Sequence, residues 1–106
     1  MDWTNSDTKA IAEFIENEDR EWIKSGKAGA AFWQGTANEV LDDCEKFKAP
    51  PGAEIIRMTD MLHYLFCGES GEPVQTGKIA DIKFSRVDWK QIAEWLLEKS
   101  RSDRSE

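Results

Sequence analysis

Apolar residues recur every three or four positions near the start of the chain, which predicts a helix from about Ser6 to Lys24. We expect Ser6 or Asp7 to cap this helix, and Gly26 and Gly29 to end it. The residues expected on its inner face are Ile11, Phe14, Ile15, Trp22 and Ile23.

A second helix is expected to begin at Thr36, where Thr-Ala-Asn-Glu forms a capping box, and to end near Lys48, before two prolines. Ahead of it, the short apolar run Ala30–Gln34 lies between two glycines and predicts a buried strand. The residues expected on the inner face of this helix are Ala37, Val40, Leu41, Cys44 and Phe47.

The following segment suits both a helix and strands. We expect a helix over 53–63 that runs into a short strand at Tyr64–Cys67. A glycine-rich loop over 68–78 leads to the clearest alternation in the chain, a strand at Ile79–Ser85. Asp88, with Gln91 three residues later, predicts the start of a last helix that ends near Lys99.

These elements together predict a small α+β fold. Residues 1–99 would form one domain of about four helices and a short antiparallel sheet of two or three strands. Residues 100–106 would form a polar C-terminal tail.

The order of elements is also that of a winged helix. The stretch Phe-Trp-Gln-Gly-Thr-Ala-Asn-Glu-Val-Leu at 32–41 resembles the opening of the helix-turn-helix in winged-helix domains of phage and plasmid replication proteins. The resemblance implies a hairpin that binds nucleic acid or a replication partner. The helix over 53–63 carries Arg57 beside Glu54 and Asp60, which is not the basic surface of a DNA-recognition helix.

The composition is that of a folding chain, because 40% of its 106 residues are hydrophobic. No apolar run is long enough to cross a bilayer, and the first residues do not resemble a signal peptide. We therefore expect a cytoplasmic protein in which Cys44 and Cys67 are reduced thiols.

The charge is unevenly distributed along the chain. Residues 1–45 hold eleven acids and four bases, which gives −7, whereas residues 46–106 hold ten of each and sum to zero. The whole formal net charge of −7 therefore belongs to the first 45 residues.

Known catalytic patterns are missing from the sequence. It has no phosphate-binding P-loop, no dinucleotide fingerprint and no nucleophile elbow. His63 and Cys67 would share one helix face, and Cys44 could add a third zinc ligand, but the two cysteines also suit a core. We expect no enzymatic activity, no cofactor and no metal.

The acidic charge suggests a protein-binding role. Carboxylates three or four residues apart on a helix lie about 5–6 Å apart at Cβ, which is comparable to the spacing of backbone phosphates. We expect an inhibitor or adaptor that mimics nucleic acid and docks onto a basic site of a larger protein, such as a site that binds nucleic acid. The alternative interpretation is that these carboxylates form an ordinary solvated surface that only aids solubility. The residues expected to bind the partner are Glu13, Glu16, Glu39, Asp42, Asp43, Trp95 and Trp3.

The two tryptophans in that set are the candidates for an exposed anchor, and the alternative role is core packing. Trp95 lies about 100° from the inner stripe of the last helix, and Trp3 precedes the first helix. The other three tryptophans, Trp22, Trp33 and Trp89, are expected in the core.

Overall fold

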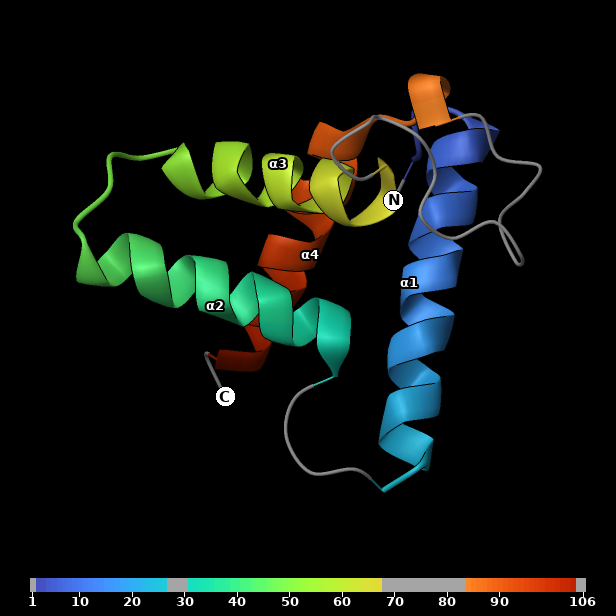
Figure 1. Ribbon diagram of the computed structural model, residues 1–106, viewed down its shortest axis with the longest axis horizontal. Coiled ribbons are helices and arrows are strands. Elements are labelled where there is room, and N and C mark those ends of the chain that lie inside the picture. The colour runs from blue at the N-terminus through green and yellow to red at the C-terminus, as the bar shows by residue number, and fades with distance from the viewer. Residues whose placement is uncertain (1, 27–30, 68–83, 105–106) are drawn as a thin grey trace.

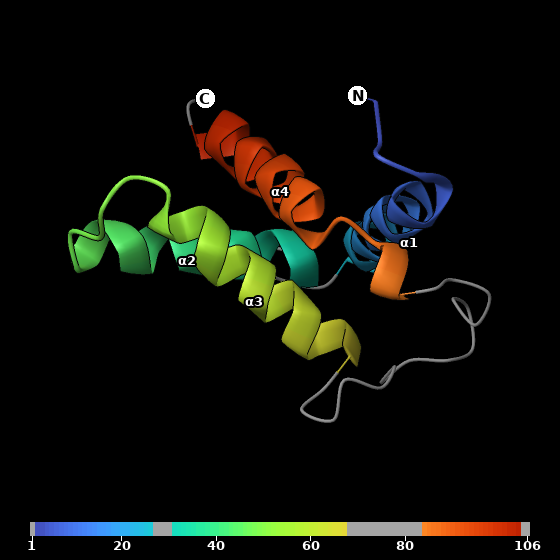
Figure 2. The same ribbon diagram turned by 90° about the horizontal axis from the view of Figure 1, so that it is seen from above.

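The computed structural model describes residues 2–26, 31–67 and 84–104, and this part of the chain is built from helices (Figure 1). A 3-10 turn, η1, lies at Phe84–Arg86. Helices α2 and α3 form a hairpin, and α4 runs across them (Figures 1 and 2). Helix α1 lies at the open end of this hairpin, opposite the turn that joins α2 to α3. The four helices are α1 at Ser6–Lys24, α2 at Phe32–Lys46, α3 at Ala53–Cys67 and α4 at Trp89–Arg104.

The predicted α+β fold is wrong, because residues 2–26, 31–67 and 84–104 contain no strand. The winged-helix interpretation is wrong with it, since that fold requires an antiparallel hairpin. Residues 68–83, and with them most of the strand expected at Ile79–Ser85, lie outside the described residues. The end of that expected strand belongs to η1.

Helix α2 begins at Phe32, earlier than the capping box at Thr36 predicts, and it replaces the expected strand over residues 31–34. Its own N-cap residue, Ala31, provides no side-chain hydrogen bond. Instead, the carboxylate of Asp19 in α1 accepts hydrogen bonds from the backbone N–H groups of Trp33 and Gln34, each at 3.1 Å. A side chain of another helix thus satisfies backbone N–H groups in the first turn of α2, whereas the sequence predicts a local cap at Thr36.

Helix α3 continues to Cys67, so the strand expected at Tyr64–Cys67 is wrong. Met58, Leu62 and Phe66 follow one another at intervals of four and are all buried. In a strand, Tyr64 and Phe66 would point to the same side of the chain. The side chain of Tyr64 is 55% exposed, whereas that of Phe66 is 1% exposed, as a helix requires.

The starts of α1 and α4 are tied together. Asn5, and not Ser6 or Asp7, caps α1, because its Oδ1 accepts from the backbone N–H of Thr8 at 2.9 Å. The cap expected at Asp88 is confirmed, since its Oδ1 accepts from the N–H of Gln91 at 3.1 Å. The buried hydroxyl of Thr8 in turn accepts from the N–H of Asp88 at 2.9 Å.

Helix α4 extends to Arg104, beyond the end expected near Lys99. Ser100 is buried, and its hydroxyl donates to the backbone oxygen of Gln34 in α2 at 3.4 Å. Arg101 donates to Glu54 in α3 at 2.8 Å. The last turns of α4 therefore continue because they contact both helices of the hairpin.

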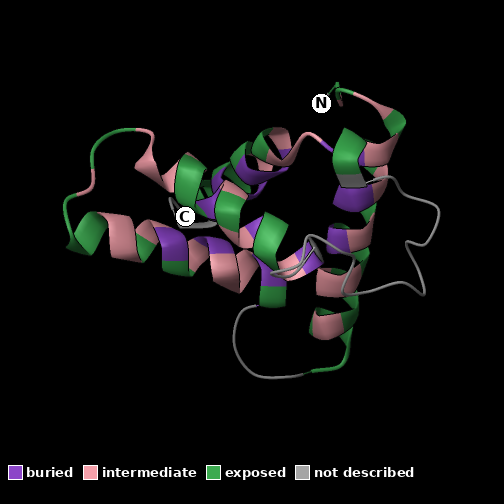
Figure 3. Ribbon diagram, turned by 45° about the horizontal axis from the view of Figure 1, so that its top comes forward, coloured by how far each residue is buried: buried purple, intermediate pink, exposed green. Residues whose placement is uncertain are grey.

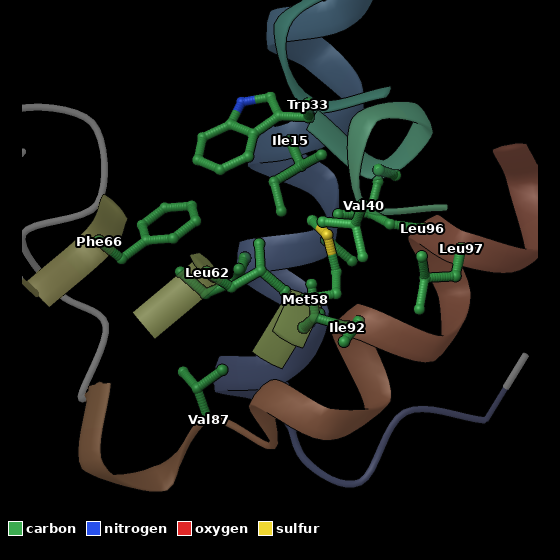
Figure 4. Close-up of a cluster of buried hydrophobic side chains, with 14 residues drawn as sticks. Ile15, Trp33, Val40, Met58, Leu62, Phe66, Val87, Ile92, Leu96 and Leu97 are labelled. Atoms are coloured by element: carbon green, nitrogen blue, oxygen red, sulfur yellow. The ribbon is translucent and has the colours of Figure 1, made fainter. Parts of the chain in front are cut away.

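The hydrophobic core lies where the four helices meet (Figures 3 and 4). Phe66 is at one end of it: its ring stacks on Trp33 at 4.9 Å between centroids and also contacts Trp89 and Phe14. The expected burial of Trp33 is confirmed, whereas Trp22 and Trp89 are half-buried. Ile23, expected on the inner face of α1, is exposed.

Candidate interaction surface

The predicted carboxylates of α1 are already accompanied by bases on the same helix. Glu13 lies 4.0 Å from Lys9, and Glu16 lies 3.5 Å from Arg20. Both pairs are solvent-exposed, so each contributes little to stability. The positive charges of Lys9 and Arg20 nevertheless reduce the local negative field on the outer side of α1.

The carboxylates of α2 lie at two positions around that helix, its outer side and its edge towards α3. Glu39 and Asp42 are exposed, on the side of α2 opposite the buried Ala37 and Val40. Asp43 lies nearer to α3 and contacts Arg57 there, with 3.4 Å between the carboxylate oxygen and the guanidinium nitrogen. The outer side of α2 is therefore acidic at Glu39 and Asp42, with Asp43 at its edge.

Helices α1 and α2 run crosswise to each other (Figure 1). Their outer carboxylates therefore do not line up in one continuous row. The structure brings Glu39, Asp42 and Asp43 together on α2 but places Glu13 and Glu16 on a separate helix surface.

Phe47 follows α2 directly and is 70% exposed, although the periodicity predicts it on the inner face. The chain turns away from the helix here: Lys48 has a φ of 52°, Ala49 donates its N–H to Cys44 O at 2.9 Å, and Lys48 donates to Glu45 O at 3.2 Å. These contacts form a Schellman motif, which ends the helix before Phe47 can reach the core. The Nζ of Lys46 lies 5.5 Å from the centre of the Phe47 ring. The sequence contains no direct signal for this exposure, since lysine is not a usual residue at the left-handed position.

Trp3 and Trp95 lie together, where the N-terminal segment meets α4. Their rings meet edge to face with 5.5 Å between centroids, and both side chains are half-buried against the rim of the core. The Nζ of Lys99 lies 5.0 Å from the centre of the Trp95 ring. The two tryptophans therefore contact each other, and they belong to the N-terminal segment and α4, whereas Glu39, Asp42 and Asp43 belong to α2.

The N-terminal segment is held on α4 by hydrogen bonds. The hydroxyl of Thr4 donates to Asp88 Oδ2 at 2.8 Å, and the side-chain N–H of Gln91 donates to the backbone oxygen of Asp2 at 2.9 Å. A shallow surface hollow of about 430 Å³ lies beside Trp3, and one of about 340 Å³ lies beside Trp95. Each hollow is open to solvent and has one tryptophan among charged and polar residues, so neither has the apolar enclosure that is typical of a cofactor site.

Asp19 is the carboxyl group that sequence reasoning missed. Its burial between α1 and α2 raises the pKa of the group, while the N–H groups of Trp33 and Gln34 and the charge of Lys99 oppose that rise. The two hydrogen bonds explain why a carboxylate lies between the helices, because they join α1 to the first turn of α2. Asp19 is thus a structural residue within the fold.

Among the side chains that the structure describes, no three His, Cys, Asp or Glu residues form a group that could hold a metal ion. His63 is exposed on α3 and lies edge to face with Trp89, 5.9 Å between centroids. Cys44 is a free, half-buried thiol packed against the core. The side chain of Cys67 lies outside the described residues.

Among the helices of the described segments, none combines the length and the apolar character that crossing a bilayer requires. Comparisons with protein-family models, with curated protein sequences and with solved structures find no match to this chain.

Proposed function

We propose that this chain is a non-enzymatic interaction protein, an inhibitor or adaptor, that docks the outer side of α2 onto a basic site of a larger protein. The partner site is of the kind that binds nucleic acid, because closely spaced carboxylates offer it charges at a spacing similar to that of phosphates. The docking takes place in the cytoplasm, in keeping with the free thiol of Cys44.

One observation carries this proposal: Glu39 and Asp42 are exposed on the outer side of α2, and Phe47, the residue that follows this helix, has an exposed ring. Carboxylates attract the partner over a distance, and an aromatic side chain supplies the apolar contact that holds it. The carboxylates Glu13 and Glu16 of α1 lie beside Lys9 and Arg20 and belong to a separate helix surface. Trp3 and Trp95 belong to a different surface.

A pair of matched double variants tests the proposal. The probe is a dye-labelled peptide of roughly ten arginines that ends in one leucine, and its affinity is measured by fluorescence anisotropy. We expect Glu39→Lys with Asp42→Lys to weaken binding about tenfold or more, and Glu13→Lys with Glu16→Lys to weaken it less than about threefold. Phe47→Ser should weaken binding of this peptide more than that of a peptide without the leucine.

Salt provides the second measurement. Because the attraction is between exposed charges, affinity should fall steeply between about 50 and 300 mM salt. Equal weakening by the two double variants, or an affinity that does not change with salt, would contradict the proposal. Circular dichroism of each variant checks that the helices remain folded.

A further inference from the structure

The outer side of α3 has apolar residues that no described helix covers. Ile56 is 68% exposed and Tyr64 is 55% exposed, on the side of α3 opposite the buried Met58 and Leu62. Helices α2 and α4 pack against α3 in the core that holds Met58 and Leu62. Exposed side chains of this size in one row are typical of a protein contact surface.

The charges on the outer side of α3 are complementary to those on the same side of a second copy of the helix. Arg57 and Asp60 are both exposed and lie three residues apart on the outer side of α3. When two α3 helices pack antiparallel about a two-fold axis between Met58 and Thr59, Arg57 of each copy faces Asp60 of the other. The same register, four residues further out, sets the small Ala53 opposite the large Tyr64. An isologous contact requires this kind of complementarity.

Both charged groups are accessible to a second molecule. Asp60 makes no ion pair or hydrogen bond within the described residues. Arg57 contacts Asp43 at 3.4 Å, but this pair is exposed, and a guanidinium has five N–H donors. Arg57 can therefore bind a second carboxylate without losing its contact with α2.

We propose that two copies of this chain form an antiparallel dimer through the outer sides of their α3 helices. Two reciprocal Arg57–Asp60 ion pairs set the register, and Ile56 and Tyr64 supply the apolar contact. The contact lies on α3, so it does not depend on the docking function proposed for the outer side of α2.

Sedimentation velocity of the full chain tests this pairing over roughly 10 to 500 µM protein. The mean mass should rise with concentration from 12.1 kDa towards twice that value. Arg57→Asp and Asp60→Arg should each weaken self-association about tenfold or more, because each sets like charges opposite one another. An equimolar mixture of the two variants should associate again, because both contacts then join opposite charges.

A third variant separates the dimer contact from the contact within one chain. Asp43→Asn removes the ion pair with Arg57 inside the molecule and should leave self-association unchanged. The swapped double variant, Arg57→Asp with Asp60→Arg, should self-associate like the original chain. A wild-type chain that stays at 12.1 kDa over the whole range, or a mixture that stays monomeric, would overturn the proposal.

Discussion

The carboxylate of Asp19 joins α1 to the start of α2, the next helix along the chain. Its two oxygens accept from Trp33 and Gln34 in the first turn of α2, where Ala31 offers no side-chain cap. Burial is the largest influence on this carboxyl and raises its pKa. The group is therefore a helix cap whose protonation is coupled to folding.

The raised pKa predicts a pH dependence with a definite sign. The folded chain holds the proton of Asp19 more tightly than the unfolded chain does. The contribution of Asp19 to the free energy of unfolding is therefore fully present below the usual aspartate pKa, and it is lost as pH rises through the folded-state pKa.

Urea unfolding of the wild type and of Asp19→Asn at several pH values measures this dependence. The asparagine keeps a carbonyl acceptor for the α2 amides but does not titrate in this range. The stability difference, wild type minus variant, should decrease as pH rises from about 3 to neutral. A difference that grows with pH would mean that the pKa of Asp19 is lowered in the folded chain.

Helix α3 owes its length to the core, although its sequence from Tyr64 onward suits a strand. Phe66 stacks on Trp33 and contacts Trp89 and Phe14, which come from three different helices. Tyr64, two residues earlier, points to solvent. Burial of Phe66 among aromatic rings thus decides the conformation of this segment.

Two alanine substitutions test the helix at this position. Phe66→Ala should lower the free energy of unfolding by about 3–5 kcal/mol, because it leaves a cavity among the aromatic rings. Tyr64→Ala, measured in dilute solution, should change it by less than about 0.5 kcal/mol. Similar large losses for both substitutions would indicate a strand with the two side chains on one buried face.

Some features that depend on neighbours in sequence were predictable, whereas contacts between distant segments were not. The bounds of α1 and the Asp88 cap of α4 follow from periodicity and local capping, and the structure agrees with both. The start of α2 and the end of α4 depend on Asp19 and on the Arg101–Glu54 contact, which join distant segments. The exposure of Phe47 depends on a left-handed Lys48, for which the sequence has no usual signal.

The surplus acidic charge is shared equally by two helices: α1 has six acids and three bases, and α2 has four acids and one base, so each carries a formal net charge of −3. Lys9 and Arg20, which pair with carboxylates of α1, lie within the first 45 residues, so their charges are already included in the −7 of that segment. Arg57 reaches Asp43 from α3, at the edge of the α2 surface. Glu39 and Asp42 are exposed on the outer side of α2, which is where we propose that a cationic partner binds.

Mapping the backbone amides by two-dimensional NMR, during titration of the isotope-labelled chain with the arginine-rich peptide, tests the docking surface most directly. We predict that the largest shift changes fall on α2, at Glu39, Asp42 and Phe47, and that they diminish when salt is added. The largest changes on α1 around Glu13 and Glu16, or small changes spread evenly over all four helices, would contradict the assignment of α2 as the docking surface.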